Sequence, residues 1–220
     1  MSTIAIIGAG PGLGAAVARR FGNEGFAVAL LARTQSKLDE LAAGLTAEGI
    51  TARGYAADVQ DQEDLAGALA VAGDELGPVE VLQYSPLPRR EFLRPVLETA
   101  FEDLATAFGF SVGGPVAAVR QVLPGMRSLG RGTVLLVNGG SAVRANPKYA
   151  GTSIAFAGES AYGAMLHEAL TGEGVHVGQL IIPGAIGPGN GPFDPEALAE
   201  TLWTMHRDRG AFRVTVGEDA

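Results

Sequence analysis

The sequence predicts a single α/β domain of the Rossmann type, with one doubly wound parallel sheet in a three-layer α/β/α arrangement over residues 1–220. Three observations predict it. Short β-rich runs alternate with helical stretches along the chain. The run at 26–32 is almost wholly apolar, as expected for a strand that is covered on both faces. The first run, at 4–7, passes through a glycine-rich turn directly into a helical stretch.

Each expected strand is a short run rich in apolar or β-branched residues. The runs lie at 4–7, 26–32, 51–57, 79–84, 132–138, 175–182 and 212–216. Right-handed βαβ units that join such runs produce a parallel sheet. Ligands of these sheets bind at the carboxyl ends of the strands. Functional residues are therefore expected just after each strand.

The helical stretches fall between these strands, at 13–23, 36–45, 62–75, 99–129, 153–170 and 195–207. The second has leucines at helical spacing, which favours an amphipathic helix. The long fourth stretch contains Gly113 and Gly114, so we expect it to bend there. The last begins with Asp194 as an N-cap and Pro195 in the first turn, which is typical of a helix start.

The composition excludes several classes of protein. Hydrophobic residues make up 47% of the chain and charged residues 18%, which indicates a substantial core rather than disorder. The net charge of −8 argues against nucleic acid as the main partner. The apolar runs fall short of the roughly 20 residues that span a membrane. The chain has no cysteine and only three widely spaced histidines, so we expect no metal site and a cytoplasmic location.

The glycine-rich turn is the most informative local feature. Gly8, Gly10, Gly12 and Gly14 lie between the first strand and the first helix. A helix N-terminus has unpaired backbone N–H groups and partial positive charge. Glycines allow a diphosphate to approach these amides without a Cβ in the way. Since glycine also serves ordinary turns, the alternative is a plain turn; the position at a strand-to-helix junction favours the cofactor cradle.

Four motifs at successive strand ends together resemble those of the short-chain dehydrogenase/reductase family. They are the glycines of 8–14, Ala32-Arg33-Thr34, Asp58-Val59 and Pro183-Gly184-Ala185-Ile186. The resemblance covers nearly the whole chain. It implies a nicotinamide dinucleotide, a small-molecule substrate and a homodimer or homotetramer paired through the stretches 99–129 and 153–170. It assigns the cofactor contacts to Gly8, Gly10, Pro11, Gly12, Leu13, Gly14, Arg33, Asp58, Val59, Ser85, Pro183, Gly184 and Ile186.

The second of these motifs favours NADP over NAD. NAD-selective sites place an acidic residue here, which accepts hydrogen bonds from the adenine ribose. This chain has no acidic residue between Ala29 and Gln35 and carries Arg33 instead. A guanidinium can bind a 2′-phosphate with two parallel hydrogen bonds. The alternative is a solvated surface arginine.

The catalytic positions depart from the family pattern. The resemblance implies a tyrosine that transfers a proton, a lysine four residues later, a serine after the fifth strand and an asparagine in the long helix. This chain contains no Tyr-x-x-x-Lys sequence. Aligned from Gly174 onward, the tyrosine position falls on Phe156 and the lysine position on Ser160, while Ser111 takes the asparagine position. Only Ser141 keeps the family residue, and phenylalanine has no proton to transfer.

Other side chains are candidate replacements for the missing tyrosine. Tyr149, next to Lys148, is a candidate acid near the cleft, with an ordinary surface tyrosine as the alternative. Tyr84 either contacts ligand or fills the core, and Asn138 either contacts ligand or satisfies backbone groups. The remaining candidates are expected to have no role in catalysis, being solvated, structural or packing residues: Glu159, His167 and Tyr162.

The sequence thus predicts an NADP-binding oxidoreductase of this family, acting on an unknown carbonyl or alcohol, with segment 185–208 covering the substrate. The alternatives are a non-catalytic NADP-binding sensor or partner subunit, and a non-redox isomerase or cyclase on the same fold.

Overall fold

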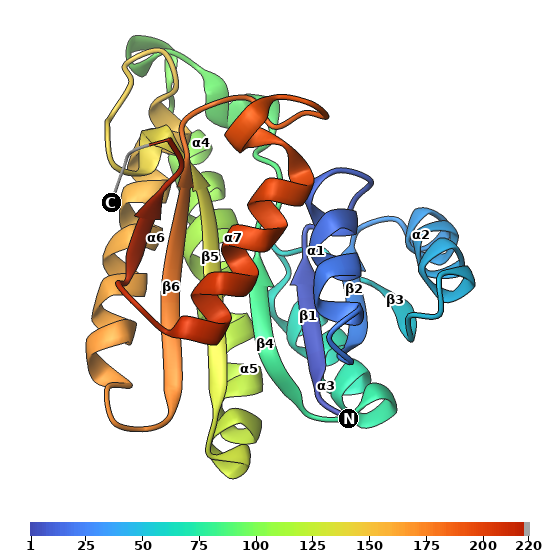
Figure 1. Ribbon diagram of the computed structural model, residues 1–220. Coiled ribbons are helices and arrows are strands. Elements are labelled where there is room, and N and C mark those ends of the chain that lie inside the picture. Colours follow the sequence, from blue (N-terminus) through green and yellow to red (C-terminus); the bar gives the residue numbers. More distant parts are fainter. Residues whose placement is uncertain (218–220) are drawn as a thin grey trace.

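The computed structural model describes residues 1–217 and confirms the predicted fold class. One sheet of seven strands has the order β3-β2-β1-β4-β5-β6-β7, and every neighbouring pair is parallel (Figure 1). The strands are β1 (Thr3–Ile7), β2 (Ala27–Ala32), β3 (Ala52–Ala56), β4 (Val79–Tyr84), β5 (Gly132–Gly139), β6 (Val175–Ile182) and β7 (Arg213–Thr215).

Helices cover both faces of this sheet, each with its own hydrophobic core. One face packs against α1 (Leu13–Gly22), α2 (Gln35–Ala47) and α7 (Pro195–Asp208). The other packs against α3 (Gln62–Leu76), α5 (Gly114–Leu129) and α6 (Ala150–Ala169). In Figure 1, α1 and α7 lie side by side in front of the sheet, and α5 and α6 lie behind it. The central strands are therefore buried on both sides, which explains their apolar sequences.

The long helical stretch is irregular next to Gly113 and Gly114, where a bend was expected. α4 (Phe101–Phe108) runs into a π-helical turn over Gly109–Gly113, and α5 follows without a break. A Cβ on Gly114 would overlap the Tyr84 hydroxyl, so glycine lets the helix approach β4 closely. Short 3₁₀ turns at Arg90–Leu93, Val96–Glu98, Gly140–Ala142 and Gly191–Phe193 were not predicted.

A side chain of α2 caps the exposed edge of the sheet at β3. The Gln35 amide nitrogen donates to the Gly54 carbonyl at 2.9 Å, and its oxygen accepts from the Ala56 N–H at 2.9 Å. An unpaired edge strand is a template for pairing with another chain. Gln35 occupies part of that edge, so β3 presents fewer free backbone groups there.

The loops that follow β1, β2, β3, β4, β5 and β6 gather along the carboxyl edge of the sheet, at the top of Figure 1. This is the edge at which ligands of such sheets bind. Among the described residues 1–217, no helix has the length and apolarity required to cross a membrane.

Candidate functional site

The turn between β1 and α1 contains glycines of two kinds. Gly8 has φ of +91°, and a Cβ there would lie 2.6 Å from the backbone nitrogen and Cα of Pro86. A Cβ on Gly14 would lie 3.0 Å from the Cα of Ala9. The fold itself therefore requires glycine at position 8 and leaves little room at position 14.

Gly10 and Gly12 are different, because a Cβ at either position would meet no protein atom within 4 Å. Neither has a positive φ. Packing thus gives no reason for glycine at these two positions. Gly12 is the N-cap of α1, whose first amides have no partner within the helix. Open space beside free helix amides is what a bound phosphate group requires.

A first cavity of about 190 Å³ opens beside this turn. Its walls are mostly apolar or glycine, and its charged side chains are Arg33 after β2, Asp58 after β3 and Arg89 after β4. Gly8, Gly10 and Val59 line it too. The cofactor-binding motifs predicted after β1, β2 and β3 are therefore brought together in space.

Asp58 is held in place on both oxygens. Its Oδ2 accepts from Nη2 of Arg89 at 2.9 Å, and its Oδ1 accepts from the Gln60 N–H at 3.1 Å. The Asp58 N–H donates to Asp64 at 3.0 Å. The carboxylate is therefore fixed at the wall of the cavity and paired with a cation.

A second cavity, of about 580 Å³, lies between the ends of β5 and β6 and the start of α6. It brings together the predicted residues Ser141, Tyr149, Pro183 and Gly184. Its other walls are mainly apolar, and Arg144 is the one charged side chain in its lining. The cavity joins hydroxyl groups to an apolar surface, which suits a small organic substrate.

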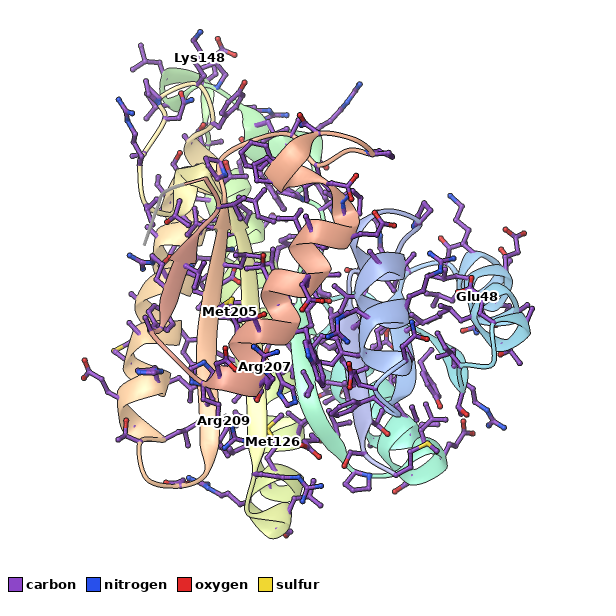
Figure 2. All side chains as sticks on the ribbon, viewed as in Figure 1. Glu48, Met126, Lys148, Met205, Arg207 and Arg209 are labelled. Carbon is purple, nitrogen blue, oxygen red and sulfur yellow. The ribbon has the colours of Figure 1, made fainter. Side chains whose placement is uncertain are left out.

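The predicted pairing of Tyr149 with Lys148 is not formed at the cleft. Tyr149 is the N-cap of α6 and lines the second cavity with 43% of its surface exposed. Lys148 is not among the lining residues, and Figure 2 shows it at the outer tip of the molecule. Tyr149 remains a candidate acid without this cationic neighbour.

Tyr84 fills the core, which corrects its place among the catalytic candidates. Only 2% of its surface is exposed, and its hydroxyl donates to the Phe110 carbonyl in the π-helical turn. Burial raises its pKa well above the ordinary value. It lines neither cavity, because β4 is a central strand and the tyrosine faces the helices behind it.

Of the two α6 positions that the alignment gives, Phe156 lines the second cavity and Ser160 does not. Thr152 and Phe156 line the second cavity, four residues apart. Ser160, placed at the lysine position by the alignment, is one turn further from the cleft and accepts from Gln179 on β6 at 2.7 Å. The cleft lies at the N-terminal end of α6, so only its first turns can reach it. Neither cleft-facing residue can replace a tyrosine or a lysine.

Glu159 is buried, so the prediction of a solvated side chain is wrong. It is 1% exposed, and its Oε2 accepts from Asn138 at 2.9 Å. Gln179 donates to Asn138 at 2.8 Å and accepts from Arg213 at 2.9 Å. The other Glu159 oxygen has no protein partner among the described residues. Burial raises the pKa of this carboxyl to about 8.

The remaining predicted residues lie at or near the two cavities, or pack nearby. Pro11 is exposed on the glycine turn, while Leu13 is buried at the start of α1. Ser85 lines neither cavity and accepts from Gln83 at 2.5 Å, while Ile186 is 41% exposed beyond Gly184. Four other side chains pack within the fold: Ser111, Asn138, Tyr162 and His167. Asn138 bonds to the side chains of Glu159 and Gln179 rather than to the backbone groups expected as its alternative partners.

Comparison with known proteins identifies the family. The family model described as short chain dehydrogenase matches residues 2–190. The protein is a short-chain dehydrogenase family member. The short-chain dehydrogenase fold is also found in solved structures. The structure of a short-chain dehydrogenase from Rhodopseudomonas palustris matches this one with a TM-score of 0.87 at 24% identity, and the match covers 99% of each chain. The structure of L-sorbose reductase from Gluconobacter frateurii was solved with NADPH and L-sorbose. It matches this one with a TM-score of 0.86 at 20% identity, over 98% of this chain and 96% of that chain.

Curated relatives of this family member match it over only part of their own length. A fatty acyl-CoA reductase of Mycobacterium tuberculosis is 26% identical over 183 residues, which are 82% of this chain and 62% of that protein. A 3-dehydrosphinganine reductase of Arabidopsis thaliana is 29% identical over 189 residues, which are 84% of this chain and 55% of that protein. The chain therefore spans less than two thirds of the length of these relatives.

Sequence reasoning missed Arg89, Thr152 and the Asn138–Gln179 connection. Arg89 lies 31 residues from its partner Asp58, in a loop without regular pattern. Its position shortly after β4 could have indicated Arg89, because functional residues are expected at the carboxyl ends of the strands.

Proposed function

We propose that this protein binds NADP(H) and catalyses oxidoreduction of a small carbonyl or alcohol substrate, without the Tyr-x-x-x-Lys pair. The observation that carries the proposal is the open space at Gly10 and Gly12 beside the N-terminus of α1. The apolar first cavity and its two arginines fit an adenosine bearing a phosphate. The NADP complexes of structurally similar proteins support the same cofactor class.

The chain's own residues have distinct roles in this proposal. The glycine turn binds the diphosphate, and Arg33, exposed after β2, binds the 2′-phosphate. Pro183 and Gly184 form the wall beside the nicotinamide. The chemistry that NADPH brings to such a cleft is hydride donation to a carbonyl carbon. Ser141 orients the carbonyl oxygen by donating a hydrogen bond, and Tyr149 holds the proton that this oxygen requires.

The covering role expected of segment 185–208 falls to its first part. α7 packs along α1 and buries Leu198 and Leu202 in the core. Asp194 joins the preceding loop to the start of α7, because its side chain accepts from the N–H groups of Gly189 in the loop and Glu196 in the helix. We assign the covering of the substrate to residues 185–194.

The second candidate is a non-catalytic NADP-binding sensor or partner subunit. Thr152 and Phe156 favour it, because the two cleft-facing positions four residues apart carry neither a phenol nor an amine. An isomerase or cyclase on the same fold has no observation of its own in its favour.

Two experiments separate these functions. Fluorescence titration with NADPH and NADH tests the cofactor, and lack of affinity for both would remove the whole proposal. A panel of carbonyl compounds then tests turnover by NADPH oxidation. If the wild type is inactive and Thr152→Tyr combined with Phe156→Lys creates activity, the natural protein is a binding module. Turnover by the wild type supports the oxidoreductase.

A further inference from the structure

Arg89 occupies a place in the first cavity that no sequence motif assigns. It follows β4, and its Nη2 donates to Asp58 at 2.9 Å, after β3. In the sheet, β3 and β4 are separated by β2 and β1. The ion pair therefore joins the two loops that flank the ends of β1 and β2, where the glycine turn and Arg33 lie.

The anchoring of Arg89 leaves most of its donors available. A guanidinium has five N–H groups in a rigid plane, and one of them is used at Asp58. Asp58 is itself fixed by the Gln60 N–H. The guanidinium is thus oriented by a buttressed carboxylate, with 29% of the side chain exposed and the cavity beside it.

The charges of this cavity favour an anion. Among its lining residues, Arg33 and Arg89 carry positive charge, and Asp58 is the one acidic residue. Because Arg89 pairs with Asp58, the carboxylate is neutralised where it would otherwise repel a phosphate. The two arginines and the aspartate together carry a net charge of about +1. A ligand with an additional phosphate on its adenosine would gain a second charged contact here.

We propose that Arg89, oriented by Asp58, is a second phosphate-binding residue of the adenosine site and discriminates NADPH from NADH together with Arg33. The proposal rests on the proposed function. It assigns to this chain a specificity-determining cation from the loop after β4, in addition to the arginine after β2.

The test is fluorescence titration of wild type, Arg89→Ala, Arg89→Lys and Arg90→Ala with NADPH and with NADH. Arg90 is the matched control, since it is adjacent, exposed and absent from the cavity lining. We expect Arg89→Ala to raise the Kd for NADPH about tenfold or more and that for NADH about threefold or less. Arg89→Lys should lie between wild type and alanine, and Arg90→Ala should match the wild type.

The outcomes can be told apart. An unchanged Kd for NADPH in Arg89→Ala overturns the inference, and so does an equal loss for NADPH and NADH. If the wild type binds neither cofactor, the proposed function itself fails. Thermal unfolding of each variant checks that the fold is kept, and Arg89→Lys preserves the charge should the alanine variant fail to fold.

Discussion

At the scale of single residues, the glycine turn separates what the fold needs from what a ligand needs. Gly8 is constrained by a positive φ and by Pro86, whereas Gly10 faces open space. The sequence presents both as members of one motif. Only the three-dimensional surroundings show that the same residue type is present for two physical reasons.

We therefore expect Gly10→Ala and Gly8→Ala to behave differently. Gly10→Ala should leave the free energy of unfolding within about 0.5 kcal/mol of the wild type, as surface changes usually do, while weakening NADPH binding. Gly8→Ala should lower the free energy of unfolding by about 1–3 kcal/mol, because a strained φ and a backbone clash are introduced together. Urea unfolding and NADPH titration measure the two effects. Normal NADPH binding by Gly10→Ala would contradict the cradle.

A second residue-scale prediction concerns the proton. If the wild type turns over a carbonyl substrate, Tyr149→Phe should lower kcat by about 10²–10⁴-fold with little change in KM, because a general acid acts mainly in the transition state. Tyr162→Phe is the control, since Tyr162 packs against the core behind the sheet. Steady-state kinetics at several pH values provide the measurement. An unchanged kcat would assign the proton to another group, such as water.

At the scale of elements, strands were predictable and helix faces were not. β4 and β6 have the predicted bounds, because both are short runs rich in apolar residues with glycine or proline close to each end. α6 is different, because alanine, glycine and serine recur on all its faces and hide which one is buried. The pattern therefore does not reveal that Glu159 is buried or that Ser160 lies away from the cleft. Nor does sequence spacing reveal Arg89, since its contact depends on two loops meeting.

The buried polar network across α6, β5, β6 and β7 has a consequence for pH dependence. The pKa of Glu159 is about 8 in the folded protein, above the ordinary carboxyl value of 4.5. Between these values the folded state holds a proton that the unfolded state has lost. The stabilisation is therefore complete below about pH 4.5 and is lost as pH rises through about 8, at about 1.4 kcal/mol per pH unit.

Glu159→Gln should remove this dependence, because glutamine mimics the protonated acid and still accepts from Asn138. Urea unfolding at pH 5.5, 6.5 and 7.5 gives the free energies. The slope against pH should be shallower in Glu159→Gln than in wild type, and Glu168→Gln, an exposed change on the same helix, should leave it unaltered. Parallel slopes in wild type and Glu159→Gln would show that Glu159 ionises freely.

At the scale of the whole molecule, the outer face of α4 and α6 is notably apolar. Phe101 is 77% exposed, Phe108 43%, Ile154 42% and Met165 63%. α4 and α6 are in contact, so these side chains belong to neighbouring surfaces. Exposed apolar groups of this kind mark association sites in many proteins. The face coincides with the stretches through which pairing was expected, and we propose that it forms the homo-oligomer contact.

Wild-type protein should accordingly have the mass of a dimer or tetramer in light scattering. Ile154→Glu combined with Met165→Glu should reduce that mass, because buried carboxylates would be left without partners. Val71→Glu is the control, since Val71 is 47% exposed on α3, outside this face. A wild type that is monomeric at all concentrations would rule out the oligomer.

The chain's single tryptophan provides a reporter of its own. Trp203 on α7 packs edge-on against Phe21 of α1, with ring centroids 5.1 Å apart, and the guanidinium of Arg20 lies 4.6 Å from its ring centroid. It lines neither of the two cavities at the strand ends. Its emission should therefore follow separation of the N-terminal helix from the C-terminal one. Tryptophan emission during denaturation can thus report the loss of packing between α1 and α7 independently of substrate binding.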